Sequence, residues 1–228
     1  MSAAIVIAVD GPAASGKGTI SRRLAKHFHF AHMDSGALYR LTALAVVEAG
    51  GDPTVEADAL SGAATIDLSR AGDPAIRTAE IGTAASRVSA IPAVRAALHD
   101  FQIAFITTPP GDSRGAVMDG RDIGTVIAPR ATAKLFIEAS PEVRAHRRWL
   151  ELAGMGIEKD ETLLLAEILA RDEADRTRPI SPLVRAPDAA LLDTSDLGIE
   201  PAFAAALALV EPKIRAALEG MLKDRHRG

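Results

Sequence analysis

The chain has 228 residues, of which 48% are hydrophobic and 25% are charged, and its formal net charge is −4. This composition is typical of one domain with insertions, and the acidic balance argues against a protein dedicated to binding nucleic acids or membranes. No cysteine is present, which excludes disulfides, thiolate catalysis and cysteine-ligated zinc. The first apolar run lacks a preceding cationic region and is stopped by Asp10, so we expect no signal peptide or membrane span, and a cytoplasmic location.

The N-terminal region reads as a strand, a glycine-rich loop and a helix. Residues 5–9 are an apolar, β-branched run typical of a buried parallel strand, and Ile20, Leu24 and Phe28 recur at helical spacing. The intervening residues lie close to the phosphate-binding pattern G-x-x-x-x-G-K-[ST]. They are Gly11, Pro12, Ala13, Ala14, Ser15, Gly16, Lys17, Gly18 and Thr19. The departure from the general pattern is that Gly18 follows the lysine and the hydroxyl comes one residue later.

Such a loop predicts a nucleoside triphosphate site. Small residues let successive backbone N–H groups curl around an anion, the following helix directs its positive end at it, and Lys17 adds a full charge. We therefore expect the loop to bind the β- and γ-phosphates of ATP. Mg²⁺ would be held largely by nucleotide oxygens, with Thr19 as the nearest protein hydroxyl. The alternative, a glycine-rich turn that binds nothing, is disfavoured by the flanking strand and helix.

Three histidines follow, at positions 27, 29 and 32. Their closeness could indicate a metal site, but they straddle a helix end and a strand start. No carboxylate or sulfur ligand joins them in the sequence, so we interpret them as solvated surface residues.

Further elements alternate along the chain. Residues 54–76 have little periodicity and we expect them to contribute little to the core. A helix that begins after Pro201 is expected to end or kink at Pro212. The remaining predictions are strands at residues 30–33, 116–118, 133–137 and 189–192, and helices at 38–47, 81–88, 94–105, 141–153 and 161–178.

Two of these helices are rich in arginine. The first opens at Ser140-Pro141 and carries Arg144, Arg147 and Arg148, and the second places Arg171, Asp175 and Arg178 on one face. A solvated salt-bridge ladder is the ordinary explanation for such a face. A hinged cover over phosphate groups is the alternative.

Five short strands separated by helices predict an α/β fold with a parallel sheet, of the three-layer type found in P-loop NTPases. Four strands end in polar turns, at Asp10, Asp34, Asp119 and Asp193, so these turns should share one edge. We expect a single kinase domain with its core at residues 1–40, 115–140 and 186–228. An acceptor-binding insertion would occupy residues 41–114 and an arginine-rich lid residues 141–185.

Several motifs together resemble one enzyme family, bacterial cytidylate kinase. They are DGPAASGKGT, DSGALYR, DGRDIGT, EASPEVRAHRR, RDEADRTRPISPL and LLDTS, in the family's order and spacing. The resemblance covers nearly the whole chain. It implies transfer of the γ-phosphate of ATP to CMP or dCMP with Mg²⁺, giving ADP and CDP or dCDP in pyrimidine nucleotide metabolism. We also expect a monomer that uses neither nucleic acid nor membrane as a partner.

The resemblance further implies roles for individual residues. Arg40 would meet the acceptor's α-phosphate, and Asp122 would join Ser86 and Arg95 around the cytosine. Forked guanidinium groups suit a doubly charged phosphate, and the amino group of cytosine needs an acceptor such as a carboxylate. The catalytic residues would be Lys17, Arg121, Arg148 and Arg178. The CMP site would comprise Ser35, Arg40, Ser86, Arg95, Arg121, Asp122, Arg171, Asp175 and Arg178.

One segment departs from the family, because residues 66–76 are too short to form fully the small antiparallel sheet usual on the acceptor side.

The phosphate-binding pattern also occurs in proteins with two other kinds of function. A kinase for UMP, AMP or a non-nucleotide acceptor would use the same loop with a different pocket. A nucleotide-dependent switch is disfavoured, because the chain has no N-K-x-D element and in fact no asparagine.

Overall fold

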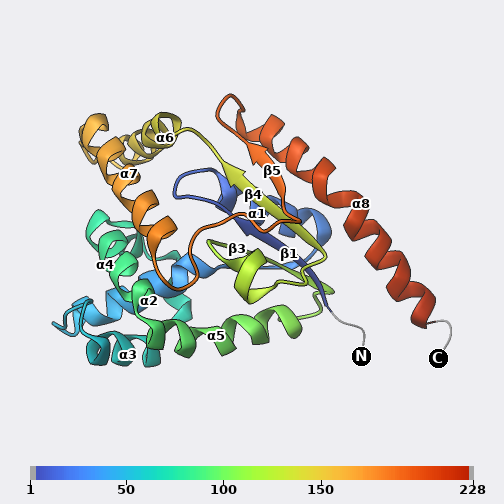
Figure 1. Ribbon diagram of the computed structural model, residues 1–228, viewed down its shortest axis with the longest axis horizontal. Coiled ribbons are helices and arrows are strands. Elements are labelled where there is room, and N and C mark those ends of the chain that lie inside the picture. The colour runs from blue at the N-terminus through green and yellow to red at the C-terminus, as the bar shows by residue number, and fades with distance from the viewer. Residues whose placement is uncertain (1–3, 226–228) are drawn as a thin grey trace. The chain divides into compact units, whose positions relative to one another are not determined.

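The computed structural model describes residues 4–225. These form two compact units, Asp34–Phe105 and the rest of the described chain. The larger unit is built on a five-stranded parallel sheet, which confirms the α/β fold that the sequence predicts (Figure 1). Its strands are β1 (Ile5–Asp10), β2 (Ala31–Asp34), β3 (Gly115–Gly120), β4 (Ala133–Glu138) and β5 (Ala190–Asp193).

The strand order β2-β3-β1-β4-β5 places β1 at the centre of the sheet. β1 pairs in parallel with β3 and with β4, so that Val9 lies opposite Asp119 on one side and Leu135 on the other. β2 and β3 lie on one side of β1 in the sheet, and the chain then crosses to the other side to form β4 and β5. Ligands of open α/β sheets bind beyond the strand ends at such a reversal, so the loop after β1 is the expected location of a site.

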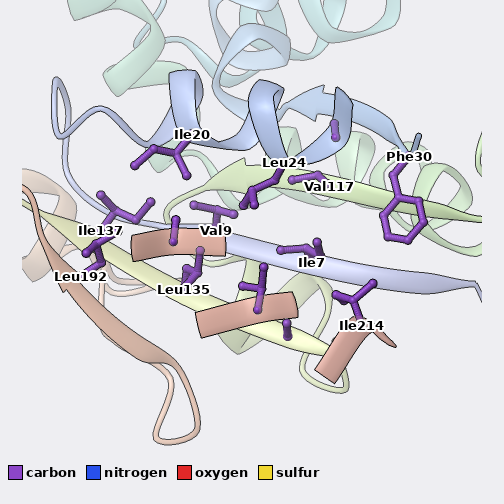
Figure 2. Packing of buried hydrophobic residues seen from close by; sticks show 14 of the residues in the cluster. Ile7, Val9, Ile20, Leu24, Phe30, Val117, Leu135, Ile137, Leu192 and Ile214 are labelled. Atoms are coloured by element: carbon purple, nitrogen blue, oxygen red, sulfur yellow. The ribbon is translucent and has the colours of Figure 1, made fainter. Parts of the chain in front are cut away.

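Helices α1 (Lys17–Phe28) and α8 (Ile199–Arg225) cover the same face of this sheet. Figure 2 shows Ile20 and Leu24 of α1 packing onto Ile7, Val9 and Leu135, and the cluster continues to α8. Alternate residues of each strand point to this face, and those between them, such as Ala8 and Met118, are buried as well, so the strands read as apolar runs. The π-helical turn η3 (Ile123–Ile127) lies against β1 with both its terminal isoleucines buried.

The smaller unit is helical and centred on α2 (Ser35–Glu48). This helix is apolar on most of its surface and is correspondingly buried, because α3, α4 and the 3-10 turns η1 and η2 pack against it. The elements are α3 (Glu56–Ala64), η1 (Leu68–Gly72), η2 (Pro74–Arg77) and α4 (Ala79–Ala90), and α5 (Pro92–Thr107) follows.

The prediction that residues 54–76 contribute little to the core is wrong for α3. Ala59 and Ala63 are buried, and a Cβ at Gly62 would come within 2.6 Å of Val46 Cγ2 and 2.8 Å of Thr42 O. α3 therefore packs on α2 through small residues. The spacing of large apolar side chains cannot reveal such a contact, because here the helices approach closely through glycine and alanine.

The expectation of a shortened segment at residues 66–76 is confirmed. Among the described residues every strand belongs to the single five-stranded sheet, and this segment forms η1 and η2 instead. Arg70 holds the two turns together. Its guanidinium donates to both carboxylate oxygens of Glu48, at 2.8 and 2.9 Å, and to Asp73 Oδ2 at 2.8 Å.

Helices α6 (Pro141–Gly154) and α7 (Glu161–Thr177) begin as predicted. Ser140 Oγ accepts a hydrogen bond from the amide of Val143, and Asp160 accepts from two amides of the first turn of α7. The predicted end or kink at Pro212 is not observed as a break, because α8 runs through it to Arg225. Proline removes one backbone donor there, and the buried Val210 and Ile214 on either side keep the helix packed on the sheet.

The close contact of α3 with α2 predicts opposite effects of the same substitution at two helical glycines. Gly62→Ala should lower the free energy of unfolding by about 1 to 2 kcal/mol, because its methyl group meets the backbone of α2. Gly82→Ala is the matched control, since nothing lies within 4 Å of a Cβ there. It should raise stability by up to about 1 kcal/mol through helix propensity. Urea unfolding of both variants measures the difference, and equal effects would contradict this packing.

Candidate active site

The loop between β1 and α1 adopts a conformation that side chains rarely allow. Gly11 has φ 154° and a Cβ there would lie 2.0 Å from the carbonyl oxygen of Ile137. Gly16 has φ 86°, and Ala14 is left-handed with φ 58°. These positive φ values turn successive peptide groups in one direction, the arrangement by which backbone N–H groups form a concave anion site.

Side chains hold the carbonyl groups of this loop. The first turn of α1 contains no acidic residue, so no carboxylate of the helix itself opposes its positive end. In a loop whose carbonyl oxygens are engaged in this way, the N–H groups are the groups that can bind an anion. The three hydrogen bonds run from Lys17 Nζ to Pro12 O at 3.1 Å, from Arg144 Nη1 to Ala13 O at 3.3 Å, and from Thr194 Oγ1 to Ser15 O at 3.0 Å.

A buried carboxylate lies beside the start of α1. Asp119, at the end of β3, is 2% exposed, and its Oδ2 lies 3.6 Å from the position a Cβ at Gly18 would take. Its Oδ1 lies 2.8 Å from Nε2 of His32. The interpretation of all three histidines as solvated surface residues is therefore wrong for His32, because a carboxylate distant in sequence joins it. Asp119 and Thr19 together present oxygen atoms near residues 11–19, which we call the phosphate loop.

A second buried carboxylate, Asp10, ends β1 and holds the turn that follows β3. Its two oxygens accept hydrogen bonds from the amides of Ile123 at 2.8 Å and Gly124 at 2.7 Å. Burial raises the pKa of Asp10 to about 6, although these two amides act in the opposite direction. The contact fixes the backbone next to Arg121 and Asp122 against the end of the central strand.

Four of the predicted site residues come together around one carboxylate. Arg121 Nε donates to Asp175 Oδ2 at 2.7 Å, and Arg178 lies 3.8 Å from Asp175 and 4.0 Å from Asp122. Burial alone would raise the pKa of Asp175, but Arg121, Arg171 and Arg178 outweigh it and lower that pKa below its usual value. We call Arg121, Asp122, Arg171, Asp175 and Arg178 the arginine cluster. Its three cations exceed its two carboxylates.

The arginines of α6 have three different environments. Arg148 Nη1 donates to Glu151 at 2.7 Å on the same helix. Arg147 donates to the hydroxyl and carbonyl oxygens of Thr194, at 3.1 and 2.6 Å. Arg144 is buried and bonds the phosphate loop. The helix therefore contacts the strand ends through Arg144 and Arg147, whereas Arg148 pairs within the helix itself.

The predicted acceptor residues of the smaller unit form two groups within it. Arg40 Nη2 donates to Asp34 Oδ2 at 2.9 Å, and buried Ser35 is the first residue of α2, after Asp34. Asp34 also caps α2 by accepting from the amide of Ala37 at 3.2 Å. This carboxylate orients the guanidinium of Arg40.

The second group lies on α4 and α5. Ser86 Oγ donates to the carbonyl oxygen of Gly82 at 3.3 Å. Arg95 Nη1 donates to the carbonyl oxygen of Ser89 at 3.3 Å, and its guanidinium lies 5.4 Å from the centre of the Tyr39 ring. The Tyr39 ring and this carbonyl thus hold Arg95 in place.

Comparison with known proteins decides the family. A model of the cytidylate kinase family matches residues 7–212. The chain belongs to the cytidylate kinase family. It is 54% identical to cytidylate kinases of Nitrobacter winogradskyi and Rhodopseudomonas palustris, each over 91% of this chain and 96% of the relative. It also resembles, at 12% identity and a TM-score of 0.53, the crystal structure of an uncharacterized protein from Eubacterium ventriosum, over 91% and 98% of the two chains. That likeness concerns the fold.

In this member of the cytidylate kinase family, sequence reasoning missed several side chains that shape the site. Asp10 and Asp119 were recognised only as ends of strands, although an acidic residue after a buried run is a signal for such a role. Arg144 was noted only for the charge of its helix. Asp172, its partner, gave no local signal, because the two are 28 positions apart.

The raised pKa of Asp10 predicts a pH-dependent contribution to stability. A folded-state pKa of about 6, above the ordinary value of 3.8, means that the folded protein binds this proton more tightly. Stability from Asp10 is therefore complete below pH 4 and is lost as the pH rises through 6. Between pH 4 and 7 the free energy of unfolding of the wild type should fall by about 2 to 3 kcal/mol relative to that of Asp10→Asn, whose side chain does not titrate.

Urea unfolding of both proteins at several pH values measures this difference. The Asn variant also tests the two backbone contacts, because its amide group can accept only one of them and should lower stability at pH 4. Parallel stability curves for the two proteins across this range would show that Asp10 does not titrate as described.

Proposed function

We propose that this protein transfers the γ-phosphate of ATP to CMP or dCMP, giving ADP and CDP or dCDP. Membership of the cytidylate kinase family across residues 7–212 is the observation that carries the proposal. The buried, cation-rich surroundings of the phosphate loop agree with it, because phosphoryl transfer requires chiefly that donor and acceptor be positioned and their charge be neutralised.

The donor would bind at Gly11–Thr19. Backbone N–H groups of the loop and the start of α1 would surround the β- and γ-phosphates, with Lys17 Nζ supplying the charge that now contacts Pro12 O. The oxygen atoms of Thr19 and Asp119 are suitable ligands for Mg²⁺, which prefers oxygen ligands and often contacts protein carboxylates through water. When bound, the ion neutralises phosphate charge. Among the described residues no three His, Asp or Glu side chains form a metal site by themselves, so nucleotide oxygens would complete the coordination.

Within the larger unit, the acceptor would bind through the arginine cluster. An oxygen of the acceptor's α-phosphate attacks the γ-phosphorus of ATP, and the bond between that phosphorus and the β-phosphate oxygen breaks. Arg121 and Arg178 would hold the attacking phosphate, and Asp122 would accept from the amino group of cytosine. Arg171 and Asp175 would complete that part of the site, while Ser35, Arg40, Ser86 and Arg95 serve from the unit Asp34–Phe105.

Arg148 would reach the phosphates from residues 141–185, which we propose as the lid. Closing such a segment excludes water that would otherwise accept the phosphoryl group. We further infer that the protein acts as a monomer in the cytoplasm and that neither nucleic acid nor membrane is a partner. Among the described residues, no helix combines the length and the apolar character that crossing a bilayer requires.

A panel of acceptors tests the assignment. Steady-state kcat/KM should be higher for CMP or dCMP than for UMP and AMP, and Asp122→Ala should raise KM for CMP while leaving KM for ATP nearly unchanged. The expected loss is about tenfold to a hundredfold, the value of one specific hydrogen bond to a base. If UMP or AMP is the best acceptor, the assignment to cytidylate is wrong. If the variant affects ATP instead, Asp122 belongs to the donor site.

Lys17→Ala tests the donor site. It should lower kcat by about a hundredfold or more, because the removed charge acts on the phosphates in the transition state. Lys26→Ala, an exposed position on the same helix, is the control and should keep the wild-type rate. Thermal unfolding of both variants separates catalysis from folding. Wild-type kcat in Lys17→Ala would refute the role.

A further inference from the structure

Arg144 and Asp172 form a buried ion pair between α6 and α7. Their exposed fractions are 1% and 2%, and two parallel hydrogen bonds join them, from Nη1 to Oδ1 at 3.0 Å and from Nη2 to Oδ2 at 2.6 Å. Removing two charges from water costs so much that such a pair contributes little net stability. A pair of this kind can instead fix one arrangement of the elements that it joins, and its further contacts indicate which.

The same guanidinium reaches two other segments. Nε donates to the carbonyl oxygen of Ala139 at the end of β4, at 2.9 Å, and Nη1 donates to the carbonyl oxygen of Ala13 in the phosphate loop, at 3.3 Å. Arg144 thus sets the phosphate loop against the sheet on one side and against α7 on the other. A single-point charge such as lysine could not make all of these contacts, because they use the planar fork of donors.

Asp172 adjoins the arginine cluster, as Arg144 adjoins the phosphate loop. It follows Arg171 directly and lies three residues before Asp175, the carboxylate around which Arg121 and Arg178 gather. Whatever fixes Asp172 therefore fixes this part of α7. The rest of the α6–α7 pair is held by its own small apolar cluster, in which Ala145, Leu152, Leu164 and Ile168 are buried. Arg144 and Asp172 lie towards the base of the pair, away from the turn at Gly154–Asp160.

We propose that Arg144 and Asp172 are positioning residues that couple the phosphate loop to the arginine cluster. Occupation of the loop by triphosphate constrains Ala13, and the pair transmits this constraint to α7, so that donor and acceptor each raise the affinity for the other. The proposal rests on the proposed function, which assigns the two ends of this connection to the two substrates. It also divides residues 141–185: the base of α6–α7 stays fixed to the sheet, and the part beyond it moves.

The experiment measures the affinity for CMP with and without the β,γ-imido analogue of ATP and Mg²⁺. In the wild type the analogue should lower the Kd of CMP about fivefold or more, within the usual range of coupling between sites. Asp172→Asn should reduce this ratio towards one, with a larger effect on kcat/KM than on kcat. Glu161→Gln is the matched control, because Glu161 pairs with His146 between the same two helices at an exposed position. It should keep the wild-type ratio.

Asp172→Asn leaves Arg144 buried without its counter-charge and can fail to fold. The double variant Arg144→Met with Asp172→Leu avoids this, because apolar side chains of similar size replace a buried pair with little loss of stability. It should melt near the wild-type temperature and still lose the coupling. A folded double variant with the wild-type ratio would overturn the proposal, since a pair that served only the packing of the two helices would leave the ratio intact.

Hydrogen exchange of the wild type tests the connection without any variant. CMP alone should slow exchange of amides at residues 13–18, and the ATP analogue alone should slow exchange at residues 168–178. Absence of both effects would overturn the proposal. Phosphorylation of CMP by the wild type is measured alongside. An inactive wild type overturns the proposed function and this inference together, whereas an active wild type without coupling overturns the inference alone.

Discussion

The site depends on how the backbone carbonyls of the phosphate loop are held. Left-handed residues turn the peptide groups of this loop, and such a conformation persists only when its surroundings determine it. Here those surroundings are side chains from α1, from α6 and from the end of β5, which bind the carbonyl oxygens of Pro12, Ala13 and Ser15. The concave anion site thus depends on the helix that follows the loop and on two segments distant in sequence. This explains why a short motif is informative only together with the sheet around it.

Buried charges at the strand ends extend the same arrangement. Asp10 holds the turn after β3, Asp119 lies beside α1, and the pair of Arg144 and Asp172 links α6 to α7. Each of these groups is costly to bury, and each is satisfied by backbone amides or by a partner side chain. The larger unit therefore combines an apolar sheet core on the α1 and α8 side (Figure 2) with a polar edge of fixed geometry. The proposed donor loop follows β1 at that edge, and Arg121 and Asp122 of the arginine cluster follow β3 there.

The sequence predicted the elements that local chemistry determines. Apolar runs identified the strands, and Ser140 and Asp160 marked the helix starts, because a capping side chain acts within three residues. Gly62 escaped notice, since an absent side chain leaves no periodicity, and so did Asp172, whose partner lies on another helix. The arginine cluster could be assembled only through resemblance to a family. Nothing in the spacing of Arg121 and Asp175 reveals that they lie 2.7 Å apart.

Calorimetric titration of Mg-ATP into the wild type and Thr194→Val tests the central claim most directly. The valine keeps the size of the side chain but lacks the hydroxyl that donates to Ser15 O and accepts from Arg147 Nη1, so the loop loses one of its three supports. The wild type should bind Mg-ATP. The variant should bind it about tenfold more weakly, as expected when the loop loses its buried hydrogen bond to the hydroxyl. The free energy of unfolding of the variant should stay close to that of the wild type. No heat of binding in the folded wild type, or equal affinities in the two proteins, would contradict a site made by a loop that other segments hold in shape.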